Sequence, residues 1–170
     1  MLVDVNDLVG GSQNIDMEIA PDAIDLDDER ARLVGPVKLN CEIARDGVQT
    51  KIAGSIESKL EVDCSRCLEP VEQTLNFDFA VQYLNAEHFA AAGEREIKPD
   101  DLAADSLEDE QIDLVEVARE QLVLNLPDRI YCREDCKGLC EKCGTNRNLQ
   151  DCSCEDEVTD PRWSALKNLK

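Results

Sequence analysis

Apolar and polar residues alternate through much of the first half of the chain. The alternation is sustained between residues 33 and 64, on both sides of the dipeptide Asp46-Gly47. A period of two places one face of a strand toward a core, and Asp-Gly between two such segments is typical of a hairpin. The same pattern over Ile15–Ile19 and Leu75–Tyr83 predicts two further strands. We expect an α+β fold that begins with an antiparallel curved sheet or a partly open barrel.

The spacing of apolar residues becomes helical after residue 110. The residues that recur at intervals of three or four are Ile112, Val115, Ala118, Leu122 and Leu126. Acidic residues near the start suit the positive end of a helix dipole, and Pro127 is a stop signal. The pattern predicts one main helix over residues 112–127 that packs on the sheet.

A second, short helix is predicted at the C-terminal end of the sequence. Asp160 is a suitable N-cap, and Pro161 suits the first helical position. Its apolar face would consist of Trp163, Leu166 and Leu169. The chain then reads as one integrated domain with four parts: a β-rich body (1–84), an acidic loop (85–111), the helix (112–127) and a cysteine-rich module that includes the terminal helix (128–170).

The charge of the chain restricts its partners. Among 170 residues there are 18 Lys and Arg against 38 Asp and Glu, a formal net charge of −20. Phosphate would repel so acidic a surface, which argues against a broad nucleic-acid-binding face. No apolar run approaches the roughly 18 residues that a membrane span needs. The first residues are acidic where a signal peptide would be basic and then apolar, so we expect a cytoplasmic protein.

The acidic loop has two interpretations. Residues 94–120, which include its second half, contain many more acids than bases. Such a run commonly serves only to keep a chain solvated, and this is the interpretation that we favour. The alternative is an electrostatic contact with a basic partner.

Nine cysteines are the most informative feature of the composition. An odd number in a chain without an export signal argues against a disulfide framework and favours metal ligation or thiol chemistry. Cys64 and Cys67 form one Cys-x2-Cys pair. Six more cysteines lie close together near the C-terminal end: Cys132, Cys136, Cys140, Cys143, Cys152 and Cys154. A Cys-x2-Cys turn lets two sulfurs converge on one tetrahedral ion, as in zinc knuckles.

The eight clustered thiols suffice for two closed structural zinc sites. The partition that we favour joins Cys64 and Cys67 with Cys132 and Cys136, and leaves the last four cysteines as a local zinc-knuckle-like site. Gly144 suits the tight backbone of such a knuckle, and Gly138 would ease the crossing between the sites. A single site built from two of the pairs, with the remaining thiols free, is also compatible with the spacing. Iron–sulfur ligation is a further alternative, ranked below zinc.

Redox chemistry is the rival interpretation of the Cys-x2-Cys pairs. A catalytic pair commonly opens a helix, whose dipole lowers the pKa of the thiol. Cys64 instead follows a run of predicted antiparallel strands, and Pro70 comes soon after Cys67. We therefore favour structural metal over a redox pair. Cys41 shares the apolar face of a predicted strand and is interpreted as a core residue.

Five basic residues lie near the six cysteines between Cys132 and Cys154. They are Arg129, Arg133, Lys137, Lys142 and Arg147, called the basic strip below. The simpler interpretation is that they balance the charge of the thiolates. The alternative is a small contact surface for RNA or an acidic partner. The sequence gives no positive case for an enzyme, because His88 is the sole histidine and no phosphate-binding loop or H-E-x-x-H motif occurs.

Taken together, these motifs resemble the YceD-like family, the large ribosomal RNA subunit accumulation proteins. The stretches that carry the resemblance are Cys64-Ser-Arg-Cys67-Leu68, Ile112-Asp113-Leu114, Leu124-Asn-Leu126-Pro127, Cys136-Lys-Gly-Leu-Cys140-Glu-Lys-Cys143-Gly144, Asn146, Asn148, Cys152-Ser-Cys154 and Asp160-Pro161-Arg162-Trp163. In order and spacing they extend over about residues 30 to 170. Glu141 is a mild departure, because proline is usual after Gly-Leu-Cys.

The resemblance implies a bacterial or plastid protein needed for normal accumulation or processing of large-subunit ribosomal RNA. It brings no established catalytic residue. From the charge we expect the partner to be a basic ribosomal protein or an assembly factor, with a large-subunit rRNA precursor as a further candidate. No membrane contact and no small-molecule substrate are expected. The alternative from another functional class is a thiol–disulfide redox protein or sensor.

Overall fold

The computed structural model describes residues 1–8, 11–47, 49–85, 104–107, 110–154 and 162. Its strands are β1 (Leu2–Asp4), β2 (Ser12–Ile19), β3 (Ala31–Leu33), β4 (Val37–Asp46), β5 (Gln49–Asp63), β6 (Pro70–Asn85), β7 (Ala104–Leu107) and β8 (Gln111–Asp113). The α-helix is α3 (Leu114–Leu124), and two short 3-10 helices are η1 (Val5–Leu8) and η2 (Pro21–Ala23).

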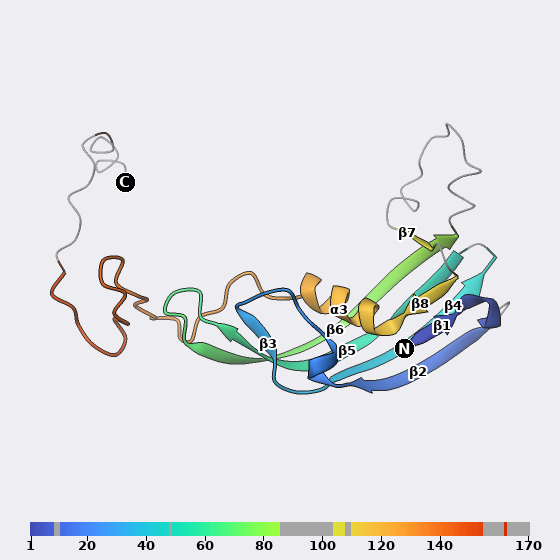
Figure 1. Cartoon of the computed structure of the whole chain (residues 1–170), viewed down its shortest axis with the longest axis horizontal. Helices are drawn as coiled ribbons and strands as arrows, with labels where there is room; N and C mark the ends of the chain where they lie inside the picture. The colour runs from blue at the N-terminus through green and yellow to red at the C-terminus, as the bar shows by residue number, and fades with distance from the viewer. Residues whose placement is uncertain (9–10, 48, 86–103, 108–109, 155–161, 163–170) are drawn as a thin grey trace.

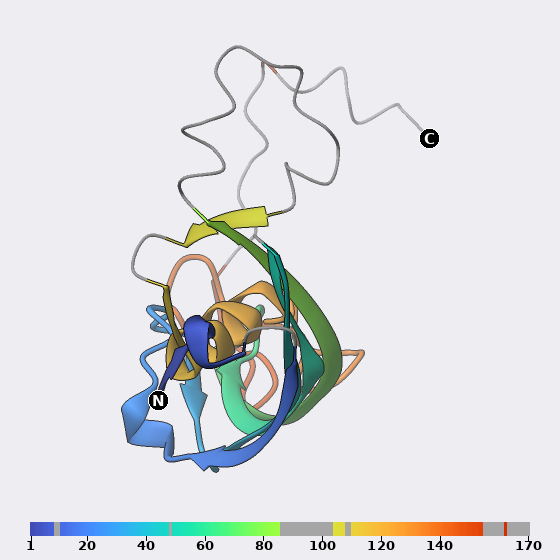
Figure 2. The same cartoon turned by 90° about the vertical axis from the view of Figure 1, so that its right-hand side faces the viewer.

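One curved sheet forms the body of the protein. Its strand order is β2-β4-β5-β6-β7. The short strand β3 pairs with the C-terminal end of β5, beyond the residues of β5 that pair with β4. All of these pairs are antiparallel except β6–β7. The sheet bends around α3 without closing into a barrel (Figure 2). The predicted antiparallel curved sheet is confirmed, as are the strands over Ile15–Ile19 and Leu75–Tyr83.

The hairpin predicted at Asp46-Gly47 joins β4 to β5. Asp46 pairs with Gln49, and Gly47 has a φ of 61°, a left-handed value that glycine adopts without steric cost. Both strands follow the alternation of the sequence, because every second side chain is buried on the concave face; these side chains are mostly apolar, and Thr50 and Ser58 of β5 are the polar ones among them.

The hydrophobic core lies between the concave face of the sheet and α3. The largest fully buried apolar side chains of the body include Leu39, Ile43, Ile52, Ile56, Leu60, Leu114 and Leu122. Each such side chain contributes about 1.5–3 kcal/mol relative to an exposed one. Cys41 is 2% exposed in this core, which confirms its predicted place.

The helix is shorter than the predicted span of 112–127. Residues 111–113 form β8, which pairs with β1, and the Asp113 side chain then accepts a hydrogen bond from the backbone N–H of Val115 as the N-cap. At the other end, the backbone N–H of Asn125 donates to carbonyls of the last turn. The apolar residues recur at helical spacing from Ile112 to Leu126, but the helix itself is shorter. Strand pairing of residues 111–113 delays its start, and the cap at Asn125 ends it.

The acidic loop and the terminal helix are the two other predicted segments. Ala104–Leu107, predicted as part of the acidic loop, form β7 and pair in parallel with the end of β6. The predicted terminal helix lies, apart from Arg162, outside the described residues, as does His88. Of the helices in the described part of the chain, none combines the length and apolar character that crossing a membrane requires.

The cysteine-rich segment extends from one end of the body. Figure 1 shows the turn between β5 and β6 at that end, with residues 132–154 beyond it. The end of the sheet therefore positions Cys64 and Cys67 beside the segment that follows α3.

Gly54 gives a test of how closely β4 and β5 approach in the sheet. A Cβ atom at this position would lie 2.1 Å from the carbonyl oxygen of Asn40 and 2.6 Å from the Cα of Cys41, both backbone atoms. Gly54→Ala is therefore expected to lower the free energy of unfolding by about 1–3 kcal/mol, measured as a shift in urea midpoint. Gly35→Ala is the matched control, since its Cβ would meet Lys59 Cβ at 3.5 Å. Equal midpoints for the two variants would contradict the packing described.

Candidate metal centres

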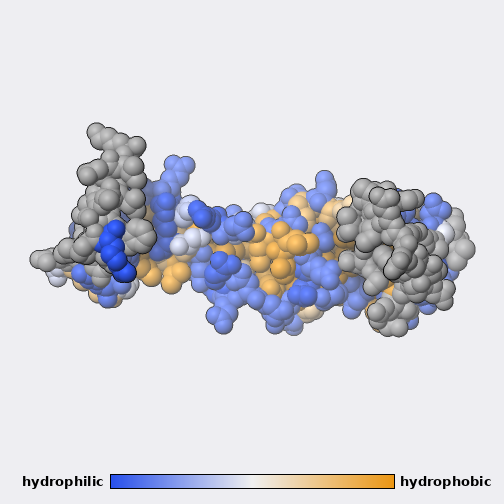
Figure 3. Space-filling view, turned by 90° about the horizontal axis from the view of Figure 1, so that it is seen from above, coloured by the Kyte–Doolittle hydropathy of each residue, from blue (hydrophilic) through white to orange (hydrophobic). Residues whose placement is uncertain are grey.

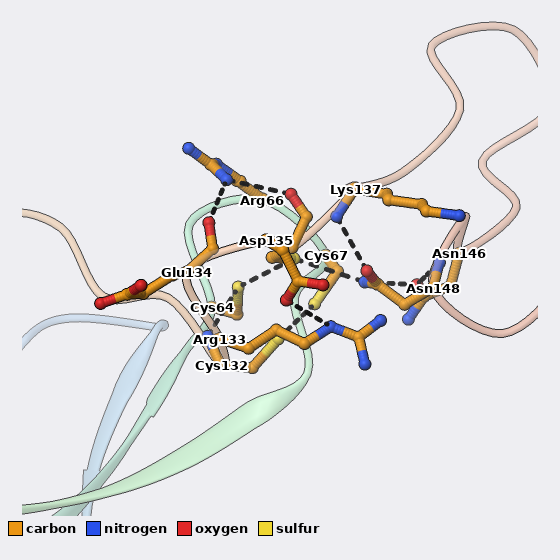
Figure 4. A network of polar contacts seen from close by, with 11 residues as sticks. Cys64, Arg66, Cys67, Cys132, Arg133, Glu134, Asp135, Lys137, Asn146 and Asn148 are labelled. Carbon is orange, nitrogen blue, oxygen red and sulfur yellow. Dashed lines mark hydrogen bonds and ion pairs between the residues drawn. The ribbon is translucent and has the colours of Figure 1, made fainter.

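The first cysteine cluster joins two distant parts of the chain. Cys64 and Cys67 lie in the turn between β5 and β6, and Cys132 and Cys136 lie in the segment after α3. Their four Sγ atoms all lie within 4.8 Å of one another. Figure 4 shows the side chains of Cys64, Cys67 and Cys132 gathered at this point. The site is largely enclosed, because three of its cysteines are buried and only Cys132 is exposed.

The sulfur separations fit a single tetrahedral metal ion. The Sγ atoms of Cys64 and Cys136 are 3.8 Å apart, and those of Cys67 and Cys132 are 3.6 Å apart. Four thiolates about 2.3 Å from one zinc ion would be about 3.8 Å from each other. A disulfide would need a separation of only about 2.05 Å, and all nine cysteines are free. The donor set and its dimensions are thus those of a closed four-sulfur site.

The second cluster is local in sequence. The Sγ atoms of Cys140, Cys143, Cys152 and Cys154 also lie within 4.8 Å of one another. It is less enclosed than the first cluster, because only Cys140 is buried. The two sets of four are those that the favoured sequence partition joins. Each of the eight clustered cysteines thus lies in a group of four.

The two Cys-x2-Cys turns have the same backbone geometry. In the first, the N–H of Cys64 donates to the carbonyl of Glu69 (2.8 Å), and the N–H of Leu68 donates to that of Cys64 (2.9 Å). In the second, Cys140 N–H donates to Thr145 (2.8 Å), and Gly144 N–H donates to Cys140 (2.8 Å).

The residue after each turn's second cysteine is left-handed. The φ of Leu68 is 59° and that of Gly144 is 71°. Both turns are therefore knuckles that direct two sulfurs to one point, and only the second has glycine at its strained position.

Backbone amides stabilise thiolates in the first cluster. Burial raises the pKa of the Cys64 thiol, but backbone N–H donors, that of Cys132 foremost, outweigh burial and lower this pKa to about 6. Burial likewise opposes ionisation of Cys136, whose pKa is lowered by the side chain of Asn148. Burial raises the pKa of Cys132 and, with the neighbouring thiols, that of Cys67 to about 12. Two of the sulfurs thus lose a proton more easily than an ordinary thiol, and a bound cation would favour the thiolate form of all four.

The second cluster divides in the same way. The Thr145 hydroxyl and N–H lower the pKa of the Cys143 thiol to about 6, and the backbone N–H groups of the turn lower that of Cys140. The neighbouring thiols raise the pKa of Cys152 and raise that of Cys154 to about 12. Amides of the knuckle therefore prepare one pair of ligands, and the other pair depends on a bound cation.

Two polar side chains that sequence reasoning did not assign a role connect the parts of the first site. Arg66, inside the first knuckle, donates to the carbonyls of Glu134 (3.2 Å) and Cys136 (3.0 Å) (Figure 4). Asn148 donates from Nδ2 to the Sγ of Cys136 (3.3 Å) and accepts from the N–H of Lys137 (2.8 Å). Asn148 stands in the family pattern, but only the structure shows that it bonds to a cysteine of the other cluster.

Glycine at 138 permits the crossing between the two sites. Its φ is 73°, and a Cβ there would lie 3.1 Å from the carbonyl oxygen of Arg66. The neighbouring Leu139 N–H donates to that carbonyl (3.0 Å). The segment between the clusters is thus held against the first knuckle by its backbone, as expected from the sequence.

All five side chains of the basic strip are exposed. Arg133 forms an ion pair with Asp135 (3.6 Å). Arg129 lies at a cavity of about 410 Å³ beside the first knuckle. The lining of this cavity also includes Arg30, Arg66, Tyr131, Asp63 and Asp128. The Arg66 guanidinium stacks over the ring of Tyr131, 4.3 Å from its centroid. The strip thus extends from this cavity over the surface of the module.

Comparison with known proteins identifies the family. A family model described as the large ribosomal RNA subunit accumulation protein YceD matches residues 52–170. This chain belongs to the YceD family. The match begins in β5 and includes all eight clustered cysteines, so the two four-sulfur clusters lie within the part of the chain that defines membership.

Curated relatives extend the match toward the N-terminal end. The chloroplastic large ribosomal RNA subunit accumulation protein YCED homolog 1 of Arabidopsis thaliana is 25% identical over 156 residues, covering 79% of this chain and 49% of that protein. An uncharacterized protein of Mycobacterium leprae is 27% identical over 138 residues, 79% of this chain and 59% of the relative. An uncharacterized protein of Mycobacterium tuberculosis H37Rv is 30% identical over 134 residues, covering 77% of this chain and 59% of that protein.

The chain spans only about half to three fifths of the length of these YceD relatives. No solved structure matches it.

Leu68 provides a test of the shared knuckle geometry. A non-glycine residue in the left-handed region is strained by about 1 kcal/mol or more, and Leu68 is 58% exposed, so its side chain packs little. Leu68→Gly is expected to raise the free energy of unfolding by about 1 kcal/mol, measured by urea unfolding. Gly144→Leu is expected to lower the stability of its own knuckle by a similar amount.

Leu149→Gly is the control for Leu68→Gly, because Leu149 is 78% exposed and is not among the described residues with positive φ. It should give no gain. If Leu68→Gly lowers the free energy of unfolding by as much as Leu149→Gly does, Leu68 is not strained.

Proposed function

We propose that this chain is a non-enzymatic accessory factor for large-subunit ribosomal RNA accumulation and ribosome assembly in the cytoplasm, acting by binding and held together by structural zinc. Membership of the YceD family supports the role in accumulation of this RNA. The observation that carries the binding role is the pair of closed four-sulfur clusters. A site with four protein ligands leaves no position open for substrate, which is the arrangement of structural rather than catalytic zinc.

Zinc is the metal that fits the clusters best. Two sulfur separations in the first cluster, 3.8 and 3.6 Å, are close to the edge of one zinc–thiolate tetrahedron. An iron–sulfur cluster attaches its cysteines to different iron atoms, and it would hold the sulfurs farther apart than the edge of one tetrahedron. Four thiolates and one Zn²⁺ carry a charge of about −2 per site, which the exposed bases of the strip partly offset.

The redox alternative is less well supported by the geometry. Cys64 and Cys67 are 0% and 4% exposed, and they lie in a turn between strands rather than at the start of a helix. A reactive cysteine pair needs an accessible thiolate. The low pKa of Cys64 instead arises from the amides that a metal-bound thiolate also needs.

The partner is proposed from charge. A net charge of −20 favours a basic ribosomal protein or an assembly factor over bare RNA. The basic strip is the exception on this acidic surface. With Arg66 stacked on Tyr131 beside it, the strip offers cations and an aromatic face to a large-subunit rRNA precursor.

Reversing the strip tests this role in cell lysates. We expect the triple variant Arg133→Glu, Lys137→Glu and Lys142→Glu to associate several-fold less with particles that contain large-subunit RNA precursors, because three phosphate-attracting cations become repulsive. The measurement is a sucrose gradient probed in each fraction for the tagged protein and for the precursor RNA.

The matched control carries the same charge change on the sheet, at the exposed residues Lys38, Lys51 and Lys59. This control should migrate with precursor particles as the wild type does. Equal association of both variants would remove the strip from the proposal. A wild-type protein that sediments only as a free small protein, with precursors unchanged on its depletion, would contradict the function itself.

A further inference from the structure

β6 has a long edge that no other strand covers in the described part of the chain, called the free edge below. On one side it pairs with β5 from Pro70 to Leu84, but on the other side only its last four residues pair with β7. Within the described part of the chain, no strand pairs with the outer side of residues 70–81. Because alternate residues of a strand direct their N–H and C=O groups to each side, this edge presents a row of backbone donors and acceptors.

Apart from the acids Glu72 and Asp78, the free edge lacks the features that commonly protect an edge strand. Edge strands are commonly blocked by lysine, by a bulge or by proline within the strand. The chain has no Lys or Arg from Leu68 to Gly93. The register of β6 with β5 is continuous from Pro70 to Leu84, without a bulge, and the only proline is the first residue of the strand. An unprotected edge of this length favours pairing with another chain.

The two faces of β6 differ in chemistry. On the concave side, apolar side chains pack against the core but stay partly exposed: Val71, Leu75, Phe77 and Val81. Apolar residues also gather at the surface over the middle of the body, near α3 (Figure 3). On the convex side every second residue from Glu72 to Ala80 is exposed, and the charged ones are the acids Glu72 and Asp78.

We propose that the free edge of β6, residues 70–81, binds an extended basic segment of another protein, which joins the sheet as an added strand. The backbone of β6 would supply the hydrogen bonds. The half-exposed apolar side chains would receive every second residue of the segment, and Glu72 and Asp78 would attract the basic residues between them. This inference specifies how the proposed basic partner is held and does not depend on the role of the basic strip.

Charge favours this occupant over a second copy of the chain. Two copies would each bring a net charge of −20, and β6 paired with itself would place Glu72 and Asp78 near the same acids of the other copy. Like charges across a strand pair are destabilising. A lysine- or arginine-rich segment has the complementary charge, which also accelerates association.

The test uses the full chain purified without chelators and a dye-labelled synthetic peptide in which lysine alternates with valine. Binding is followed by fluorescence anisotropy. Thr74→Lys with Asn76→Lys adds two cations to the free edge, at exposed positions. The control, Asn40→Lys with Ala53→Lys, adds two cations to the same exposed face on the internal strands β4 and β5. A peptide with the same residues in separate lysine and valine blocks controls for net charge.

We expect the alternating peptide to bind the wild type and the control variant alike, and the edge variant about tenfold more weakly. The block peptide should bind weakly to all three proteins. Hydrogen exchange should slow at alternate amides of residues 70–81 when the alternating peptide is present.

Four results would overturn the proposal. Equal weakening in both variants would show general charge attraction, and absence of binding to the wild type would remove the site. Edge amides that are already protected in the free protein, or a dimer that the edge variant dissociates, would show that this chain itself occupies the edge. None of these results bears on association with precursor particles, so the proposed function fails or stands separately.

Discussion

Four sulfurs that converge at the end of the β5–β6 hairpin determine how the rest of the structure is joined. Cys64 and Cys67 belong to a turn of the sheet, whereas Cys132 and Cys136 lie beyond the helix. Residues 132–154 include few apolar side chains, so packing alone gives this segment little stability. A metal bound by all four sulfurs would attach it to the sheet, and the backbone bonds from Ser65 to Ile130 and from Leu139 to Arg66 fix its orientation.

The sequence predicts those parts of the structure that depend on local pattern. Alternation locates β4, β5 and β6 because one face of each is buried, and cysteine spacing favours the observed grouping of the sulfurs without deciding it. The start of α3 was predicted wrongly because residues 111–113 pair with β1, a contact that no local period reveals. The strained Leu68 could have been found by aligning the two Cys-x2-Cys turns, where it stands opposite Gly144. The bond from Asn148 to Cys136 depends on how the two clusters sit together and has no sequence signal beyond the family pattern.

The architecture separates two kinds of surface. The cysteine module at one end carries the basic strip, and the sheet carries an uncapped strand edge with acidic and apolar faces. The Cys64–Cys67 knuckle, which contacts the module, directly precedes β6, since Pro70 follows Cys67 closely. A metal in the first site would therefore hold the origin of the free edge as well as the module. Both proposed contacts thus adjoin the same four sulfurs, although β6 is also held by its pairing with β5 from Pro70 to Leu84.

The most direct test of this account is X-ray absorption at the edge of the bound metal, with metal content per chain measured on the same sample. The full chain, purified without chelators, should contain two zinc ions per chain, each with four sulfur ligands at about 2.3 Å. Nitrogen or oxygen in the first shell, or a protein that binds no metal while all nine cysteines stay reduced, would contradict it.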